Sequence, residues 1–158
     1  MKIISRSDKE TIALGRKFSG VLQEKDVVIL EGQLGGGKTT FTKGVLKGLK
    51  YKGRVLSPTF TLVRNYPTKK FGVYHVDLYR LKTKDTLSLG FEDFIYCPKT
   101  ITLIEWGKKI KQELEKYILI EFSYLGQNSR KLLFSPSGWS RKRSQTLKKI
   151  FNNELTSN

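Results

Sequence analysis

A run of glycines followed by a lysine and two threonines, Gly32 to Thr40, has the residue types needed to bind a chain of phosphates. Its spacing, Gly32-x-x-x-x-Gly37-Lys38-Thr39, matches the P-loop pattern. Glycines let backbone N–H groups approach phosphates closely, because they have no Cβ and adopt positive φ. The lysine ammonium then reaches the β- and γ-phosphates, and the threonine hydroxyl binds Mg²⁺. The pattern therefore predicts a nucleoside triphosphate site, and a glycine-rich turn with an unrelated lysine is the disfavoured alternative.

Two acidic residues, Asp77 and Glu105, stand at the expected ends of strands. Ile101 to Trp106 is an apolar run that contains an acid near its end, which is what a P-loop domain needs beside its first strand. We expect Glu105 to bind Mg²⁺ directly or through water, although Asp is more usual there and a solvent-facing Glu is the alternative. Asp77, at the end of a strand that begins at Val73, is a candidate to order the attacking water or the Mg²⁺ water shell.

Four other polar residues each allow two interpretations. Thr59 and Thr61 follow the bend at Pro58, where their hydroxyls would meet a γ-phosphate and Mg²⁺, as switch segments do. Their alternation instead favours threonines on the wet face of a half-buried strand. The only histidine, His75, is more typical of packing or hydrogen bonding than of chemistry, and the lack of a second His or Cys cluster excludes a structural zinc site. Arg130 either contacts adenine or phosphate from a hairpin tip, or is simply exposed.

The hydrophobic pattern around these residues alternates between strands and helices. A β-branched apolar run precedes the P-loop, and Phe41, Val45 and Leu49 recur with helical spacing after it. We expect helices over residues 8–23, 40–49, 83–90, 107–116 and 139–155, and strands over 27–30, 59–64, 73–77, 101–105, 117–124 and 130–134. The fold class is therefore α/β, a single P-loop NTPase domain with a mostly parallel central sheet, flanking helices and a C-terminal antiparallel hairpin.

Composition narrows the class of protein further. A chain of 158 residues suits one domain, and its single cysteine, Cys97, excludes an internal disulfide and favours a reducing compartment. An early charge argues against a signal peptide, and no apolar run approaches the roughly 20 residues that span a bilayer, so we expect a cytoplasmic protein without a membrane partner. The net charge of +16 favours polyanions. Because lysines dominate and are dispersed, weak salt-sensitive RNA association is more strongly indicated than specific RNA contact.

Four motifs stand in order along the chain: the P-loop, Ser57-Pro-Thr-Phe-Thr-Leu-Val63, His75-Val-Asp-Leu-Tyr-Arg-Leu81 and Leu103-Ile-Glu-Trp106. Together they resemble the small bacterial ATPase family of tRNA threonylcarbamoyladenosine synthesis, TsaE, formerly YjeE. The resemblance covers the chain from about Ser7 to Phe134, and the last twenty residues carry no family signal. One departure is Gly107 after the final motif, where the family often has proline, and it affects a loop.

The resemblance implies ATP and Mg²⁺ as ligands, slow hydrolysis by the isolated protein, and two partner subunits. These partners are the threonylcarbamoyl transferase and its inactive paralogue, and tRNA is reached only through their complex, which ATP turnover resets. We expect residues 1–138 to be the P-loop ATPase domain, and 139–158 to be a basic C-terminal helix and tail packed on the same domain. The resemblance implies catalytic roles for Lys38, Asp77 and Glu105 and Mg²⁺ ligation by Thr39 and Glu105. The implied ATP contacts are Leu34, Gly35, Gly36, Gly37, Lys38, Thr39, Thr40, Thr59, Thr61 and Asp77, with Arg130 a looser match.

Three other functions fit parts of the sequence less well. A small-molecule kinase would share the P-loop but needs an arginine-rich lid, and no compact arginine cluster lies between the P-loop helix and Glu105. A GTPase needs a guanine-reading Asn-Lys-x-Asp segment, which the sequence lacks. A plain RNA-binding module would need paired aromatic base-stacking motifs, and none is present.

Overall fold

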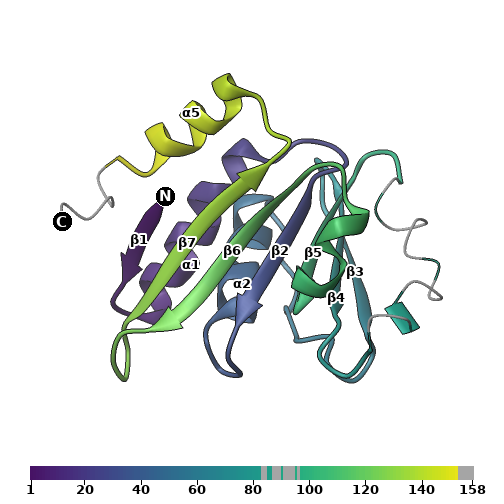
Figure 1. Ribbon diagram of the computed structural model, residues 1–158, viewed down its shortest axis with the longest axis horizontal. Helices are drawn as coiled ribbons and strands as arrows, with labels where there is room; N and C mark the ends of the chain where they lie inside the picture. Colours follow the sequence, from purple (N-terminus) through teal and green to yellow (C-terminus); the bar gives the residue numbers. More distant parts are fainter. Residues whose placement is uncertain (83–84, 87–89, 91–94, 96, 153–158) are drawn as a thin grey trace.

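The computed structural model describes residues 1–82, 85–86, 90, 95 and 97–152. Within them, seven strands form one sheet in the order β1-β7-β6-β2-β5-β4-β3, with helices packed beside it (Figure 1). The strands are β1 (Lys2–Ser5), β2 (Val27–Gly32), β3 (Val63–Pro67), β4 (Gly72–Asp77), β5 (Thr100–Glu105), β6 (Tyr117–Tyr124) and β7 (Arg130–Ser137). The α-helices are α1 (Asp8–Phe18), α2 (Lys38–Gly48) and α5 (Arg141–Ile150), and the 3-10 helices are η1 (Ser19–Val21) and η2 (Gly107–Glu113).

The centre of the sheet is parallel and its edges are antiparallel. Strands β6, β2, β5 and β4 run in one direction, while β1, β7 and β3 pair antiparallel with their neighbours. The α/β class and the C-terminal hairpin β6–β7 are as expected. All six residues of β5 are buried, as a central parallel strand covered on both faces requires. In the register, Glu105 lies beside Leu30 of β2 and Asp77 of β4, so both acids reach the edge of the sheet where β2 leads into the P-loop.

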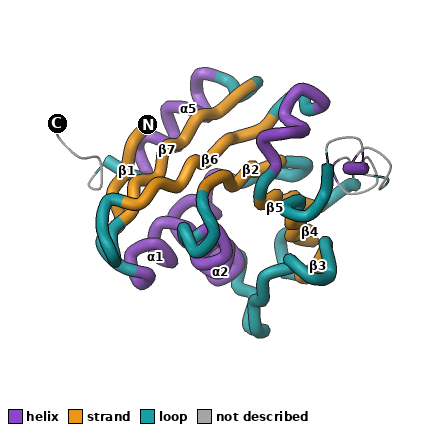
Figure 2. The backbone as a smooth tube through the Cα atoms, turned by 60° about the horizontal axis from the view of Figure 1, so that its bottom comes forward, coloured by secondary structure: helices purple, strands orange, loops and turns teal. Residues whose placement is uncertain are grey.

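Alternate residues of the central strands enter two separate hydrophobic clusters. On β2, Val28 and Leu30 face the cluster built with α1 and α2, while Val27 and Ile29 face a second cluster that includes Ile110 of η2. Figure 2 shows α1 and α2 side by side on one face of the sheet. Because β2 is packed on both faces, its position and direction in the sheet are fixed, and so is the start of the P-loop that follows it.

Helix α5 lies at the end of the sheet opposite to the P-loop, beyond β7 (Figure 1). Its Leu147, and Phe151 just after it, join the same cluster as α1 and α2, and the Phe134 and Phe151 rings lie 5.3 Å apart. None of the described helices is long and apolar enough to cross a membrane.

Several expected elements differ in the structure. Residues 59–61 form a turn, because the Thr61 amide donates to the Pro58 carbonyl and Leu62 has a φ of 62°, so β3 begins only at Val63. The helix expected over 107–116 is the 3-10 helix η2, and the first α-helix ends at Phe18. Strand β1 had no counterpart among the expected strands. Residues 83–84 and 87–89 of the helix expected over 83–90, and residues 153–155 of the helix expected over 139–155, lie outside the described residues.

Candidate nucleotide-binding site

The P-loop lies where its flanking elements predicted, between the end of β2 and the start of α2. Gly37 is the N-cap of α2 with a φ of 101°, and Gly35 has a φ of 72°; both values strain any residue with a Cβ. Lys38 is the first residue of the helix, so the unpaired N–H groups of the first turn face the loop. This arrangement supplies both backbone donors and the positive end of a helix dipole for an anion.

The ammonium of Lys38 lies against the base of the loop. Its Nζ donates to the carbonyl oxygens of Gly32 at 2.7 Å and Gln33 at 2.9 Å, and it lies 4.2 Å from the centre of the Trp106 ring. Burial lowers the pKa of Lys38, against the opposing charges of Glu105, Glu31 and Asp77. The lysine is therefore held in place by neutral partners, at the position from which it would meet an incoming phosphate.

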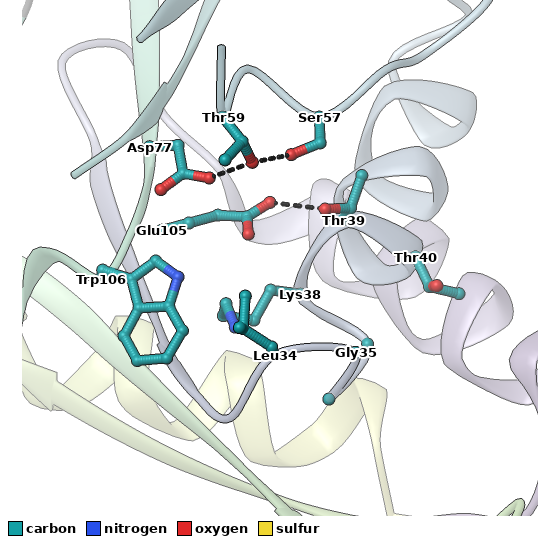
Figure 3. A pocket seen from close by; sticks show the side chains of 12 residues that line it. Leu34, Gly35, Lys38, Thr39, Thr40, Ser57, Thr59, Asp77, Glu105 and Trp106 are labelled. Atoms are coloured by element: carbon teal, nitrogen blue, oxygen red, sulfur yellow. Dashed lines mark hydrogen bonds between the residues drawn. The ribbon is translucent and has the colours of Figure 1, made fainter. Parts of the chain in front are cut away.

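Glu105 joins three elements at the carboxyl edge of the sheet. Its Oε1 accepts a hydrogen bond from Thr39 Oγ1 at 2.8 Å and lies 2.9 Å from His75 Nε2 (Figure 3 shows the first of these). Burial on its own raises the pKa of Glu105, but the hydrogen bond and charge of His75, the Thr39 hydroxyl and the Lys38 charge outweigh it, so the pKa is lowered. An ionised carboxylate thus faces the hydroxyl at the start of α2.

Asp77 stands beside Glu105 and holds the segment that follows Pro58. Its Oδ2 accepts from Thr59 Oγ1 at 2.6 Å, and Thr59 Oγ1 is 2.7 Å from Ser57 Oγ (Figure 3). The other oxygen, Oδ1, accepts from the Tyr79 amide at 2.9 Å. The carboxylate is therefore fixed in orientation and links the Ser57–Thr59 turn to the end of β4.

One pocket collects most of the residues expected at the site. It is lined by the P-loop and the start of α2, by the turn after Leu56, and by the ends of β4 and β5. Its lining residues are Leu34, Gly35, Gly36, Gly37, Lys38, Thr39, Thr40, Ser57, Thr59, Asp77, Glu105 and Trp106. Thr61 and Arg130 do not line it; the Thr61 hydroxyl lies 3.5 Å from the Pro58 carbonyl.

Arg130 supports the P-loop from behind and is not exposed. The side chain is buried, its Nη1 donates to Asp8 Oδ1 at 2.6 Å and to Thr11 Oγ1 at 3.0 Å, and it ties the hairpin to α1. A Cβ on Gly37 would lie 3.0 Å from Arg130 Cδ. The expectation of an exposed arginine is therefore wrong, because Arg130 lies between β1 and β6 and its guanidinium bonds to α1.

The donor set fits Mg²⁺ with a triphosphate. Mg²⁺ keeps several waters and binds through one or two protein oxygens together with substrate phosphates. Thr39 and Glu105 offer such oxygens side by side, next to the loop that would hold the phosphates. Among the described residues, no group of three or more His, Cys, Asp or Glu side chains is placed to bind a metal ion by itself.

Two residues of the pocket were missed by sequence reasoning. Trp106 has a left-handed backbone, with φ 60° and ψ 30°, and its ring lies beside both Lys38 and Tyr79. Ser57 contributes a hydroxyl next to that of Thr59. Trp106 follows Glu105 and Ser57 precedes Pro58 in the sequence. This adjacency to residues already identified as candidates was the signal that could have found them.

A glycine-rich loop between a buried strand and a helix, with acids at the ends of neighbouring parallel strands, defines a P-loop nucleotide-binding fold. The model of the family described as threonylcarbamoyl adenosine biosynthesis protein TsaE matches residues 5–132. The chain belongs to the TsaE family.

Individual relatives agree with this assignment. The tRNA threonylcarbamoyladenosine biosynthesis protein TsaE of Nostoc sp. is 37% identical over 140 residues, which cover 86% of each chain. The protein of the same name from Bacillus subtilis is 34% identical over 131 residues and 82% of each chain. The crystal structure of Bacillus subtilis YdiB superposes with a TM-score of 0.77 at 25% identity, covering 98% of this chain and 96% of that one.

Proposed function

We propose that this chain is a Mg²⁺-dependent ATP hydrolase that serves the formation of threonylcarbamoyladenosine in tRNA, at the adenosine next to the anticodon. The observation that carries the hydrolase proposal is the convergence of Lys38, Thr39, Asp77 and Glu105 on one pocket at the P-loop. Membership of the TsaE family, whose relatives are named for this pathway, supports the tRNA assignment. ATP is favoured over GTP because the sequence lacks a guanine-reading Asn-Lys-x-Asp segment.

In this proposal the phosphates lie along the P-loop. Backbone N–H groups from Leu34 to Thr40 surround the β-phosphate, and Lys38 exchanges two carbonyl partners for phosphate oxygens. The Trp106 ring packs against the Lys38 ammonium. Arg130 keeps the loop in position through its contact with Gly37, and does not touch the nucleotide.

The hydrolytic step is assigned to the acids and the threonines. Thr39 and Glu105 would hold Mg²⁺, which would supply positive charge beside the transferring phosphate. Asp77 orients the attacking water through a remaining lone pair, while the Thr59 hydroxyl and the Tyr79 amide hold its two oxygens in place. Thr61 reaches the γ-phosphate only if the 57–61 turn shifts, because its hydroxyl lies against the Pro58 carbonyl in this structure.

The physiological role is assigned to a complex. Its other members are the threonylcarbamoyl transferase and its inactive paralogue; ATP turnover by this chain resets them between rounds, and tRNA is met through them. Residues 1–138 form the ATPase domain in this proposal, residues 139–158 are its packed C-terminal extension, and the complex works in the cytoplasm.

Calorimetry and turnover assays test the proposal. We expect heat of binding when ATP is added to the folded protein with Mg²⁺, loss of this heat in Lys38→Ala, and wild-type binding in Lys43→Ala, where an exposed lysine of the same helix is removed. Adding the transferase pair is expected to raise the ATPase rate markedly. Absence of ATP binding contradicts the nucleotide site, while binding without stimulation contradicts only the partner assignment. Tighter binding of GTP than ATP favours a GTPase.

A further inference from the structure

Helix α5 carries a concentration of positive charge that the nucleotide site does not use. It lies outside residues 5–132, the segment that the family model matches. Its ten residues include five basic side chains and no acidic one. Four of them are exposed, and we call them the α5 basic surface: Arg141, Lys142, Lys148 and Lys149.

The helix that presents this surface is firmly attached to the domain. Leu147 is buried, and so is Phe151 directly after the helix. The fifth cation, Arg143, is partly buried: it forms an ion pair with both carboxylate oxygens of Asp26, donates to the Val21 carbonyl at 2.9 Å, and stacks 3.6 Å from the centre of the Trp139 ring. The exposed cations are therefore held in a fixed arrangement, so little conformational freedom of the backbone is lost on binding.

A hollow at the start of α5 extends the surface. It is lined by Lys70, Lys142 and Arg143, together with Ser140, Gln23 and neighbouring residues; no lining residue is acidic, although Asp26 lies behind the lining, bonded to Arg143 and to the Gln23 amide. The first turn of α5 contributes to its wall, where the positive end of the helix dipole adds to the side-chain charges. Asp26 neutralises Arg143, so the charges that favour an anion in this hollow are those of Lys70 and Lys142, which have no acidic partner among the described residues, together with the start of the helix.

Among the described residues, the four exposed cations have no acidic partner that would give them a stabilising role. In the part of the chain that the structure describes, none of them forms a hydrogen bond or an ion pair with an acidic side chain. Like charges on one helix repel each other, so their concentration lowers stability slightly unless a polyanion binds. The positive charge of the α5 basic surface is therefore better explained by binding to a partner than by stabilisation of the fold.

We propose that the α5 basic surface, with the hollow beside it, binds the phosphodiester backbone of RNA. The cations form two pairs at the two ends of the helix, Arg141 with Lys142 and Lys148 with Lys149. About 10 Å of helix separates the pairs, the axial length of about three phosphates in one strand of a nucleic acid duplex. The choice of RNA over other nucleic acids rests on the proposed function in tRNA modification.

Because the surface lies at the opposite end of the sheet from the P-loop, it binds RNA independently of the nucleotide (Figure 1). Contact with phosphates positions an RNA without reading its sequence. The chain thus contributes its own RNA contact to a complex that would otherwise hold tRNA only through other subunits.

Fluorescence anisotropy with a labelled, unmodified tRNA transcript tests this on the full chain. The variant R141Q/K142Q/K148Q/K149Q keeps good helix formers at exposed positions, and circular dichroism checks that it is folded. We expect its Kd for tRNA to rise about tenfold or more. The slope of log K against log salt, measured between about 50 and 200 mM, is expected to fall by about one unit for each phosphate that the variant no longer neutralises.

A matched variant distinguishes binding at the α5 basic surface from binding due to the overall positive charge of the protein. K43Q/K47Q/K50Q/K52Q removes the same number of exposed cations in and just after α2, and its Kd is expected to stay within about twofold of wild type. Equal weakening in both variants, or none in the α5 variant, overturns the proposal. So does displacement of the tRNA by poly-glutamate at lower charge concentration than by unlabelled RNA, which would identify an acidic protein as the partner.

The same samples distinguish this proposal from the nucleotide site. The α5 variant is expected to bind ATP with Mg²⁺ like the wild type, and Lys38→Ala is expected to bind tRNA like the wild type without ATP. If the wild type binds tRNA through α5 but does not bind ATP, the proposed hydrolase function fails and the RNA surface stands. If ATP binding alone is observed, the RNA surface fails.

Discussion

The ring of His75 lies 2.9 Å from Glu105, through Nε2 and Oε1, on adjacent strands β4 and β5. An ionised carboxylate only accepts hydrogen bonds, so Nε2 carries the proton and donates. His75 is fully buried, and its Nδ1 has no hydrogen-bond partner among the described residues. The same Glu105 oxygen accepts from Thr39, so the histidine fixes the carboxylate that faces the start of α2.

Replacing His75 is therefore expected to weaken Mg²⁺ use more than ATP binding. In His75→Ala the carboxylate loses the donor that orients it, and losses of this kind typically cost about 10–100-fold in metal affinity or activity. The Mg²⁺ concentration for half-maximal ATP turnover is expected to rise by about that factor, with ATP binding measured without Mg²⁺ unchanged.

His75→Gln provides the matched variant, because its side-chain amide donates a hydrogen bond from a similar distance. It is expected to recover part of the loss in Mg²⁺ affinity. A purely structural role for His75 would instead lower thermal stability in both variants and leave the Mg²⁺ dependence of turnover as in the wild type.

Replacing Asp77 is expected to lower the rate of ATP hydrolysis without changing the affinity for ATP. Asp77→Asn keeps the size of the side chain and an oxygen for the Tyr79 amide, but removes the charge that would orient a water. We expect the ATPase rate to fall about 100-fold or more, with the Kd for ATP within about threefold of wild type. Single-turnover kinetics and calorimetry measure the two quantities separately.

Thr59→Val serves as the control for Asp77, since it removes the hydroxyl that donates to Oδ2 and leaves the charge. A smaller loss of rate than in Asp77→Asn is expected. If Asp77→Asn turns over ATP at the wild-type rate, Asp77 has no role in hydrolysis and only anchors the 57–59 turn.

The lowered pKa of Glu105 makes the stability of the ligand-free protein depend on pH. The folded state holds this carboxyl deprotonated to a lower pH than the unfolded state, whose carboxyl titrates near its ordinary value of 4.5. The contribution to stability is therefore complete above that value and is lost as the pH falls through the folded pKa.

Urea unfolding of the wild type and Glu105→Gln, without Mg²⁺ or nucleotide, measures this contribution. The wild type is expected to be the more stable at neutral pH, with the difference in free energy of unfolding shrinking as the solution is acidified below about 4.5. The other carboxyl groups titrate in both proteins and cancel. A difference that stays constant from neutral to acidic pH contradicts the assignment.

The sequence predicted the elements whose local pattern agrees with their packing. Strands β2 and β5 are continuous apolar runs, and strand β4, helix α2 and the β6–β7 hairpin have hydrophobic periodicity; all five were expected close to their observed bounds. The P-loop was predicted because its residue types and spacing are local in sequence, and Gly32, Gly35 and Gly37 have the positive φ that favours glycine. Strand β1 was missed because it is only four residues long and is formed by pairing with β7, a contact between distant parts of the chain.

The candidate site was predictable where each residue follows directly from the end of a strand. Asp77 and Glu105 fall into this group, since parallel strands bring their carboxyl ends to one edge. The partners of His75 and Arg130 could not be predicted in the same way. His75 meets Glu105 only through the β4–β5 register, and Arg130 meets Asp8 across 122 positions of the sequence. Their roles depend on tertiary packing and not on local pattern.

Replacing Arg130 tests whether its buried side chain keeps the P-loop in its observed conformation. Its side chain is buried against α1 and Gly37, so Arg130→Ala leaves a cavity and removes the donor to Thr11. We expect the free energy of unfolding to fall by about 2–3 kcal/mol, since buried arginines contribute through packing as well as charge. The Kd for ATP is expected to rise about tenfold, because Gly37 is then free to leave the conformation that aims its N–H group at a phosphate.

Asp8→Asn separates the ion pair from the packing of the arginine. The Asp8 side chain is 70% exposed, so solvent screens its charge, and in this variant Arg130 keeps its hydrogen bond to Thr11; we expect a loss of about 1 kcal/mol or less and ATP binding like the wild type. Chemical unfolding and calorimetry on the two variants measure both effects. If Asp8→Asn weakens ATP binding as much as Arg130→Ala, the start of α1 contacts the nucleotide itself. If neither variant weakens it, the P-loop keeps its conformation without the hairpin, and the contact between Arg130 and Gly37 serves the fold alone.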